Sequence, residues 1–452
     1  MDTVSDSSPT PALILGAGPV GLAAALLLAN QGRQVTVFEA RPNLVLNDDN
    51  SYPIGVNLRG QETLRQIDPA LVDRLRSDGE IVEGFRIHSA SRVLAQLPSG
   101  TLIATTRAHL TQILLDQAQQ HPLISLTYGH KLTGLDLDSR TLTFDTETGQ
   151  TTCDVKDSLV LCADGVWSAA RRALADQIPS FSPRVDEWGV QFRVLFSQPG
   201  ASAPELDPAY HHIFTSQGIY TATLPNQRWC VAVTALKGRE SEEMLLSTEA
   251  SHSNVAALRA HLHTHAPKVL PLLTDDDLRA YFSREPFGGA IIRCPRVDFH
   301  EWLVLLGDAA HGVIPPTGEG VNSGLEDALL LAQTLAGPSS TPLADYGRAR
   351  MPDLRALGEY ATAARNNVVN EDPAQTVTNV VLRIIGAVGA RFGRRDSQVE
   401  ERLFGPNAAR QPYREAIIPW ILFRERWSRV VLPIARGALG VVSLVARPRP
   451  RQ

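Results

Sequence analysis

Residues 12–41 read ALILGAGPVGLAAALLLANQGRQVTVFEAR, and this stretch decides the fold of the chain. The short apolar run at 12–15 predicts a buried strand, and three glycines follow it in the spacing GxGxxG. An apolar helix then runs to about residue 30, and residues 35–38 predict a second strand that ends in Glu39. A strand, a glycine-rich turn, a helix and a second strand in this order are typical of a dinucleotide-binding unit.

Each glycine of this turn has its own physical reason. Gly16 allows the tight turn, Gly18 lets a pyrophosphate approach the backbone, and Gly21 lets the helix pack closely on the strand. Glu39 stands about twenty residues further on, where a carboxylate can accept hydrogen bonds from ribose hydroxyls. A bare GxGxxG could be a turn without function, but the strand, helix and acidic residue in the correct order favour a nucleotide site.

A second stretch, residues 159–172, repeats this pattern with the sequence LVLCADGVWSAARR. A buried strand ends at Asp164 and Gly165, and a helix that carries Arg171 follows. At the carboxyl end of a strand, Asp164 is placed to meet a ribose or a pyrophosphate. The alternative is an N-cap aspartate, which is the default role for an acidic residue just before a helix.

The third stretch is EWLVLLGDAAHGVIPPTGEGVNSGLEDALLLAQTL, residues 301–335. Residues 302–306 predict a buried strand, and Asp308 follows it at the edge of the sheet. After a loop with prolines and glycines, a helix is expected to open near Asn322. Because backbone N–H groups of such a loop and a helix N-terminus can bind an anion, this stretch predicts a ligand site.

These patterns predict an α/β protein with a Rossmann-like nucleotide-binding domain at residues 10–180 and 295–340. An antiparallel-sheet substrate domain at 181–294 is expected to be inserted into it, and a helical region at 341–452 to follow it. Residues 81–106 read as three short strands of a small antiparallel insertion, which contribute to the substrate domain.

Two arginines stand at predicted helix starts. Arg59 is expected just before a helix, and the sequence favours a cofactor contact no more than a surface position. Arg107 opens the helical pattern RAHLTQILLDQAQQ.

Composition narrows the function classes. The formal net charge of −5 gives no reason to expect nucleic-acid binding. The four cysteines form no CxxC pair, which favours a reducing cytoplasm over a disulfide frame or a zinc site. The polar start is no signal peptide, and no run of about twenty apolar residues predicts a spanning helix. On a helix only His261 and His265 share a face, while His263 does not, so no metal site is expected there.

The C-terminal stretch from residue 417 to residue 452 is apolar, aromatic and basic together. This composition suits a helix that contacts a membrane peripherally, and it equally suits a packed helical subdomain that covers the active site. The last six residues are basic and are expected to be frayed.

In this order, the three stretches resemble the class A flavoprotein monooxygenases, which have the para-hydroxybenzoate hydroxylase fold. The middle motif of that family, DGxxSxxR, is matched by Asp164, Gly165, Ser168 and Arg171. The last motif, GDAAHxxxP, is matched from Gly307 to Pro315. Within the family, the loop HGVIPPTGEGVNSGLED is similar to that of the kynurenine 3-monooxygenase branch.

Three departures from that branch bear on the substrate. The branch carries a substrate-binding arginine just before its Ile-His pair, where this chain has Phe85, with Arg86 displaced by one position. One residue along a strand changes the face. The branch's loop Pro-Phe-Phe-Gly-Gln-Gly is here PPTGEG at residues 315–320, and a tyrosine that the branch carries further on is missing from TLIAT. We therefore expect a largely apolar aromatic or prenylated substrate of secondary metabolism instead of an amino acid.

The resemblance implies FAD as the cofactor and NADPH or NADH as a transient reductant. It also implies O2 as co-substrate, a flavin 4a-hydroperoxide as oxygen donor, and hydroxylation or epoxidation as the reaction. Arg107 and Asp308 would hold the ribityl and pyrophosphate region, and the loop backbone would line the flavin ring. The implied cofactor-binding residues are Gly16, Gly18, Val20, Gly21, Glu39, Ala40, Arg41, Arg59, Arg107, Asp164, Gly307, Asp308, Pro315, Gly318, Gly320, Val321 and Asn322.

The loop residues Pro315, Gly318 and Glu319 are the expected catalytic residues. Glu319 and His88 are candidate general bases for a phenolic or indolic substrate. For His311 we expect a structural role, with its imidazole hydrogen-bonded at the end of the strand.

Three other functions share parts of this pattern. A flavin-dependent halogenase would need a lysine after the first motif and a WxWxIP stretch, and the sequence has neither. A flavin-dependent oxidoreductase without oxygen insertion and a flavin-binding protein that sequesters a ligand remain as alternatives.

Overall fold

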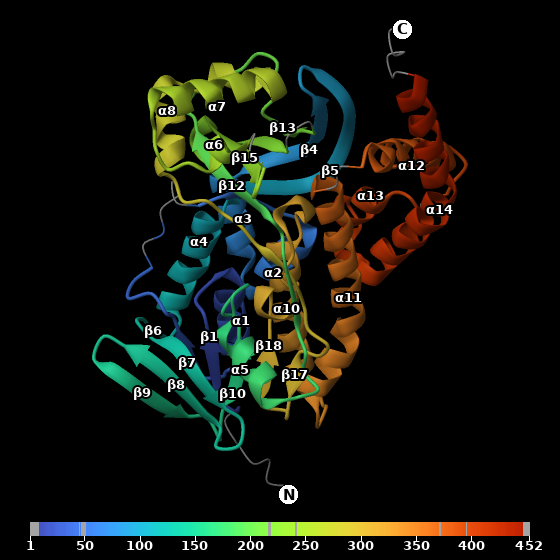
Figure 1. Ribbon diagram of the computed structural model, residues 1–452. Coiled ribbons are helices and arrows are strands. Elements are labelled where there is room, and N and C mark those ends of the chain that lie inside the picture. Colours follow the sequence, from blue (N-terminus) through green and yellow to red (C-terminus); the bar gives the residue numbers. More distant parts are fainter. Residues whose placement is uncertain are drawn as a thin grey trace, which may run out of the picture.

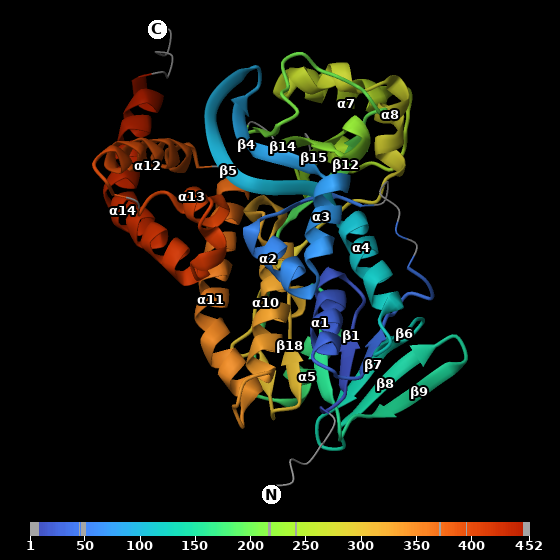
Figure 2. The same cartoon turned by 180° about the vertical axis from the view of Figure 1, so that it is seen from behind.

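The structure is a computed structural model that describes residues 9–44, 46, 51–215, 218–239, 242–369, 372–394 and 396–445. Figures 1 and 2 show a largely parallel sheet in the N-terminal unit, a second sheet stacked beyond its end, and a group of helices to one side. The fold is the mixed α/β architecture that the sequence predicts.

The first sheet has six strands in the order β17-β18-β10-β1-β2-β6. All neighbours in it are parallel except the edge strand β17, which runs antiparallel to β18. Its apolar strands are buried on both faces, which is why they read as short continuous apolar runs. The strands are β1 (Ala12–Leu15), β2 (Val35–Phe38), β6 (Ile124–Thr127), β10 (Leu159–Cys162), β17 (Asp298–Phe299) and β18 (Leu303–Leu305).

The second sheet has seven strands in the order β12-β15-β14-β13-β4-β5-β3, with β13 and β4 parallel and the others antiparallel. The expectation of three short strands within residues 81–106 is wrong. Two long strands form instead, because the register shifts between Val82 and Gly84 and between Ile87 and His88 absorb extra residues without ending the pairing. The strands are β3 (Pro53–Val56), β4 (Glu80–Ser89), β5 (Arg92–Thr106), β12 (Val190–Phe196), β13 (Tyr210–Phe214), β14 (Ile219–Leu224) and β15 (Arg228–Leu236).

Alternate residues of this second sheet face two different neighbours. Val231 and Val233 pack with the helices α7 and α8, whereas Cys230 and Ala232 pack in a cluster that contains Ile314 of the third motif stretch. One face of the sheet is therefore turned toward the nucleotide-binding unit, and the other toward a helical layer.

Two small antiparallel sheets complete the strands: β7 (Lys131–Asp136), β8 (Thr141–Thr146) and β9 (Gly149–Asp154), and the pair β11 (Arg184–Glu187) and β16 (Ala290–Arg293). The helices are α1 (Pro19–Asn30), α2 (Leu58–Ile67), α3 (Pro69–Asp78), α4 (Arg107–Gln120), α5 (Ala169–Gln177), α6 (Glu243–Leu246), α7 (His252–His265), α8 (Asp275–Ala280), α9 (Asp308–His311), α10 (Gly320–Leu335), α11 (Pro342–Val369), α12 (Pro373–Arg391), α13 (Val399–Phe404) and α14 (Tyr413–Val445).

Two helix starts differ from the sequence prediction. Helix α10 begins at Gly320, before the expected Asn322, because no side-chain cap marks its start. Arg59 lies inside the first turn of α2 and not before it, since the Asn57 side chain accepts hydrogen bonds from the backbone N–H groups of Arg59 and Gly60 and so forms the N-cap.

The C-terminal region is helical, as the sequence predicts. Helices α12 and α14 pack against each other, and α14 also packs on α11 (Figures 1 and 2). Within the described residues, no helix is both long enough and apolar enough to cross a bilayer. The basic residues at the end of the chain, for which fraying was expected, lie outside the described residues.

Candidate functional site

The carboxyl ends of four parallel strands meet at one edge of the first sheet. Leu15 of β1 pairs with Phe38 of β2 and with Cys162 of β10, and Cys162 pairs with Leu305 of β18. The three acidic or glycine-rich turns of the sequence follow these strands and therefore lie together, as does Glu39. In open α/β sheets, ligands bind at this edge.

Close contacts between the turns confirm that they converge. A Cβ added to Gly16, which has a φ of 101°, would lie 2.6 Å from the carbonyl oxygen of Ala163 in the second turn. A Cβ on Gly307 in the third turn would lie 3.1 Å from the Val20 side chain in the first helix. A Cβ on Gly21 would lie 2.0 Å from the carbonyl oxygen of Gly16, so this glycine is required for the helix to pack on the strand.

Gly18 differs from its neighbours because the protein itself does not require a glycine there. Its φ of −77° suits any residue, and the nearest atom to an added Cβ is the Arg107 guanidinium at 3.7 Å. The space in front of this backbone is open, and it lies at the start of α1 beside an arginine. A pyrophosphate group fits such a cradle, because both the helix N-terminus and the guanidinium favour a negative charge.

Glu39, which directly follows β2, is 7% exposed and lies beside the glycine-rich turn. Its carboxylate accepts hydrogen bonds from the backbone N–H of Ala17 at 3.0 Å and from the Arg41 guanidinium at 2.7 Å. Burial acts to raise the pKa of Glu39, but these hydrogen bonds outweigh it and lower the pKa below its usual value. The group is therefore an ionised acceptor next to the turn, with Ala40 and Arg41 exposed beside it.

Asp308 stands out within the third motif. It is exposed, although residues 302–307 before it and 309–312 after it are all buried. The surrounding protein nevertheless raises the pKa of its carboxyl, chiefly by desolvation. Accessibility combined with desolvation indicates a group on the wall of an internal space and not on the outer surface. Arg107, which is also exposed, acts on this carboxyl as a nearby positive charge.

The N-cap residue of α5 is Ser168 and not Asp164, as the alternative had it, but the Asp164 carboxylate still binds the first turn of this helix. Its Oδ2 accepts hydrogen bonds from the backbone N–H groups of Ala169 at 2.8 Å and Ala170 at 3.1 Å. Its Oδ1 is buried and, among the described residues, has no hydrogen-bond partner. A buried acceptor without a partner is rare in folded proteins, and a ribose hydroxyl would satisfy it.

Arg171 of the same motif ties the second turn to the third. Its guanidinium donates to the carbonyl oxygens of Ala309 at 2.9 Å and Val166 at 2.7 Å, and the side chain is 2% exposed. Ser168 caps the helix that carries it, by accepting a hydrogen bond from the Arg171 backbone N–H. Ser168 and Arg171 thus hold the second and third turns in place through hydrogen bonds inside the protein.

A buried carboxylate, Asp327 on α10, holds the third turn. It accepts hydrogen bonds from the Gly307 backbone at 2.9 Å, from the His311 ring and from the Arg350 guanidinium at 2.7 Å. Burial alone would raise the pKa of Asp327, but His311 and Arg350 outweigh it and lower the pKa to about 2. This arrangement agrees with the structural role expected for His311. The sequence reasoning missed Asp327 and Arg350, whose pairing joins α10 to α11.

The loop that follows, residues 315–320, has an exposed and a buried side. Pro315 and Gly318 are exposed, and Gly320 and Val321 are partly exposed. Asn322 is buried and donates to the carbonyl oxygens of Gly318 at 3.0 Å and of β3 at 2.9 Å, so it fixes the loop to the second sheet.

Glu319 lies on the buried side of the loop with 0% exposure. It accepts hydrogen bonds from the Tyr413 hydroxyl at 2.6 Å and from the Asn57 amide at 3.2 Å. Burial raises its pKa to about 7, although Tyr413, Arg59 and Asn57 each act to lower it. Tyr413 begins α14, so this hydrogen bond joins the C-terminal region to the loop.

Arg59 belongs to the same junction. It is 2% exposed, pairs with Glu326 at 2.7 Å and stacks over the Tyr413 ring at 4.0 Å. It also donates to the backbone carbonyl of Gln411. Its guanidinium is thus occupied by protein groups of α10 and of the C-terminal region.

The face of the second sheet that is turned toward the loop 315–320 carries aromatic side chains. Phe404, at the end of α13, would touch a Cβ on Gly318 at 3.3 Å, and its ring centroid lies 5.7 Å from that of Phe85 on β4. Phe85, Phe404 and Tyr220 are all partly exposed although the C-terminal helices cover this region. His88 lies on the other face of the sheet, where its ring contacts His212 at 3.0 Å.

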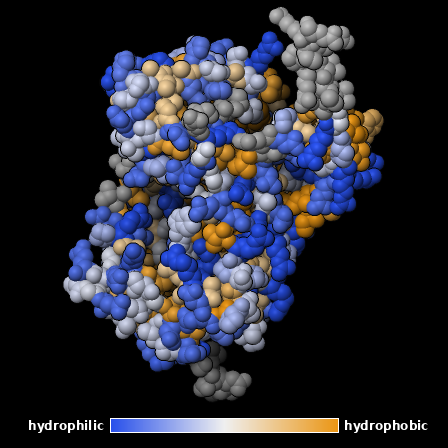
Figure 3. Space-filling model, viewed as in Figure 1, coloured by the Kyte–Doolittle hydropathy of each residue, from blue (hydrophilic) through white to orange (hydrophobic). Residues whose placement is uncertain are grey.

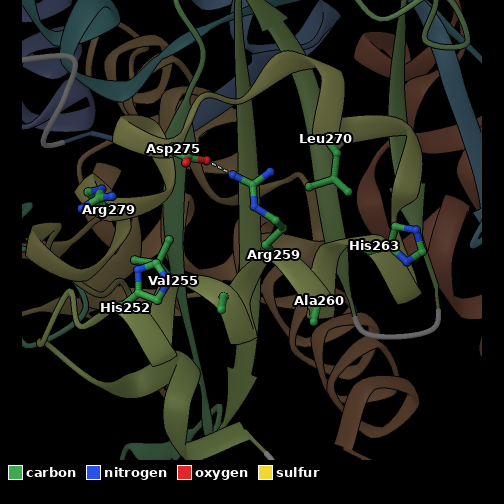
Figure 4. A pocket seen from close by; sticks show the side chains of 9 residues that line it. His252, Val255, Arg259, Ala260, His263, Leu270, Asp275 and Arg279 are labelled. Carbon is green, nitrogen blue, oxygen red and sulfur yellow. Dashed lines mark hydrogen bonds and ion pairs between the residues drawn. The ribbon is translucent and has the colours of Figure 1, made fainter.

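A second depression lies far from this site, on the outer surface of α7 and α8 (Figure 4). Arg259 in it pairs with Asp275, and His263 points into the same groove. His261 instead faces His265, with ring centroids 4.7 Å apart. This groove and the loop 315–320 are on opposite sides of the second sheet.

Comparison with known proteins places this geometry in a family. The model of the FAD binding domain family matches residues 9–345. Kynurenine 3-monooxygenase of Neurospora crassa is 26% identical over 390 residues, which cover 77% of this chain and 76% of that protein. The enzyme of the same name from Drosophila willistoni is 28% identical over 358 residues, or 77% of each chain.

Solved structures show the same fold. The p-nitrophenol 4-monooxygenase of Pseudomonas putida DLL-E4 has a TM-score of 0.65 over 92% of this chain and 98% of that chain, at 17% identity. The tetrameric 2-methyl-3-hydroxypyridine-5-carboxylic acid oxygenase has a TM-score of 0.65 over 81% of this chain and 94% of that chain, at 16% identity. With three converging turns and a cradle for a pyrophosphate, the chain belongs to the FAD binding domain family and is an FAD-dependent monooxygenase that uses NAD(P)H and O2.

Proposed function

We propose that the protein oxygenates a largely apolar aromatic or prenylated small molecule, by hydroxylation or epoxidation, in secondary metabolism. The substrate would lie between the loop 315–320 and the face of the second sheet that carries Phe85. When bound, FAD reduced by NAD(P)H supplies the activated oxygen. The residues of the chain bind the reactants, orient them and exclude water from them.

One observation carries the choice of substrate class. Phe85 lies on the face of β4 that meets His211 of β13 and Phe404 of α13, with ring centroids 5.6 Å and 5.7 Å away. The neighbouring Arg86 pairs with Asp207 at 2.9 Å and stacks over the Tyr210 ring at 4.0 Å. Its positive charge is engaged there, on the alternate face of the strand, and is not available to bind a substrate carboxylate beside Phe85.

The same geometry suggests a division of roles for the predicted cofactor residues. Gly18, Arg107, Asp164 and Asp308 would hold the nucleotide and pyrophosphate, and the exposed backbone from Pro315 to Val321 would meet the flavin ring. For Glu319 we propose a positioning role in place of proton transfer to substrate, because its carboxylate is enclosed by Tyr413 and Asn57. For Arg59 we likewise propose that it supports the loop through Tyr413.

The test is product analysis under ¹⁸O2 with a panel of uncharged aromatic and prenylated substrates and with kynurenine. We expect one labelled oxygen atom in the product of an uncharged substrate and no coupled turnover of kynurenine. NAD(P)H oxidation without label in any product would identify an oxidoreductase that inserts no oxygen. Tight ligand retention without any NAD(P)H oxidation would identify a sequestering protein. Efficient labelling of kynurenine would refute the argument from Phe85.

We further propose that the C-terminal helices contact an anionic membrane surface. Helix α12 exposes one apolar stripe, and apolar patches gather over this region in Figure 3. The stripe consists of Val377, Val380, Ile384 and Val388, which are 41% to 58% exposed. The exposed arginines Arg383 and Arg391 flank it, as in helices that lie at a lipid interface.

Vesicle sedimentation tests this contact. Ile384→Asp should reduce binding of the protein to vesicles that contain phosphatidylserine, whereas Thr376→Asp, an exposed position beside the stripe, should reduce it less. Equal behaviour of the wild type and Ile384→Asp, or wild-type protein that stays wholly in the supernatant, would count against a membrane contact.

A further inference from the structure

One polar pair stands in the apolar sheet face that the proposed function assigns to the substrate. The hydroxyl oxygen of Tyr220 on β14 lies 2.7 Å from Nδ1 of His211 on β13. In the strand register His211 is opposite Phe85, and Tyr220 is opposite Ile213, so all of these side chains point to the same face. A histidine and a tyrosine are therefore placed among apolar neighbours, and Tyr220 packs against the cluster that contains Ile314, the residue before the loop 315–320.

The second ring nitrogen of His211 is unsatisfied. His211 is 2% exposed, and its Nε2 is buried with no hydrogen-bond partner among the described residues. Leaving a buried donor or acceptor unpaired costs about 1–3 kcal/mol, so a ligand atom that pairs with Nε2 would remove this cost.

The pair remains uncharged at working pH. Burial, with a smaller effect of His212, lowers the pKa of His211 to about 3. Burial raises the pKa of the Tyr220 hydroxyl well above its usual value. A neutral pair cannot attract a carboxylate by charge, so its ligand is a neutral polar atom.

The hydrogen bond also indicates which ring nitrogen of His211 carries the proton. A phenol is a better proton donor than a neutral imidazole, so the Tyr220 O–H donates to Nδ1, and the proton of the ring then sits on Nε2. His211 thus presents an N–H donor, and its complement is an acceptor such as a carbonyl or hydroxyl oxygen.

We propose that His211, held in this tautomer by Tyr220, binds a carbonyl or hydroxyl oxygen of an otherwise apolar aromatic substrate. The proposal rests on the proposed function and narrows its substrate class to uncharged aromatics that carry a ring oxygen. His211 is then a specificity-determining residue and Tyr220 its positioning residue. A ligand without the oxygen would leave the N–H unpaired, which corresponds to about 10- to 100-fold weaker binding.

The experiment compares 1-naphthol with 1-methylnaphthalene, two uncharged aromatics of similar size, by titration of the FAD-loaded enzyme without NAD(P)H. Flavin absorbance and tryptophan fluorescence report the dissociation constants without turnover. We expect the wild type to bind 1-naphthol about 10-fold or more tightly than 1-methylnaphthalene. In His211→Phe this preference should vanish, with binding of 1-methylnaphthalene retained.

Tyr220→Phe provides a second variant, since it keeps the ring and removes only the group that fixes the tautomer; it should reduce the preference in part. Tyr210→Phe is the matched control and should keep the preference, because this tyrosine of β13, the strand of His211, contacts Glu83 on the opposite face. A preference that persists in both His211→Phe and Tyr220→Phe overturns the assignment. Equal wild-type affinity for the two ligands overturns it as well and leaves the proposed function standing. No binding of either ligand defeats the proposed substrate class itself.

Discussion

Replacement of Glu319 by glutamine tests how the C-terminal region holds the loop 315–320. The carboxyl is fully buried and bonded to Tyr413 and Asn57, and burial raises its pKa from an ordinary 4.5 to about 7. Glutamine has almost the same shape and can still accept the Tyr413 hydrogen bond. It does not titrate, so the substitution isolates the effect of the charge.

The sign and size of the effect follow from proton linkage. Between pH 4.5 and about 7 the folded protein keeps a proton on Glu319 that the unfolded chain releases. The free energy of unfolding therefore falls as pH rises through this window. The difference between the two pKa values corresponds to about 3 kcal/mol, present below pH 4.5 and lost once pH exceeds about 7.

Urea unfolding of wild type and Glu319→Gln at a series of pH values from 5 to 8 measures this difference. All other titrating groups are common to both proteins, so the gap in unfolding free energy between them should shift by up to about 3 kcal/mol, in favour of the variant as pH rises. Glu425→Gln, at a position 57% exposed on α14, is the control and should show a nearly constant gap. Parallel pH profiles for wild type and Glu319→Gln would refute the reasoning.

Four further substitutions test other parts of the site. Gly18→Val should give a folded protein without yellow colour, because its backbone angles suit valine but the side chain enters the open cradle; Gly21→Val should instead prevent folding, since its Cβ would lie 2.0 Å from a backbone oxygen. Absorbance at the flavin bands and circular dichroism separate these outcomes, and full flavin content in Gly18→Val would contradict the cradle. Arg350→Met should lower the free energy of unfolding by about 3–5 kcal/mol in urea titrations, since it removes the guanidinium that pairs with the buried carboxylate of Asp327; a loss below about 1 kcal/mol would show that the pair is not needed. Phe404→Ala should raise the hydrogen peroxide released per NAD(P)H oxidised, because water gains access between the loop and the sheet; an unchanged peroxide yield in a peroxidase-coupled assay would argue against that barrier.

The nucleotide edge could be predicted from sequence because its determinants are local. Gly21 is fixed by its contact with Gly16 within one strand-turn-helix unit, and an apolar run before each turn marks the strands. The order of the strands in the sheet brings the three turns together, and Gly16 is then fixed by its contact with Ala163 of the second turn. The capping alternative for Asp164 was readable only in part, since its carboxylate binds the first turn of α5 but the N-cap residue is Ser168.

The supports of the loop could not be predicted, because each is a pair of residues far apart in the chain. Asp327 falls in the polar positions of an amphipathic helix, and nothing near it in sequence announces that Arg350 will meet it. Tyr413 and Glu319 are likewise separated by 94 positions. Arg59 looked like a helix-start arginine for the same reason: its partner ring belongs to α14. Periodicity reveals which face of an element is buried, and it does not reveal which partner buries it.

Through these long-range pairs, the C-terminal region contributes side chains that contact the loop 315–320. Tyr413 reaches the buried carboxylate of the loop, and Phe404 touches the other side of the same loop at Gly318. Both contacts act on the short segment whose exposed backbone we propose to meet the flavin ring. A region that only anchored the protein to a surface would not need a buried hydroxyl and an aromatic ring at that segment. The C-terminal helices therefore hold the loop in place through buried contacts. This role does not depend on what surface their exposed apolar stripe binds.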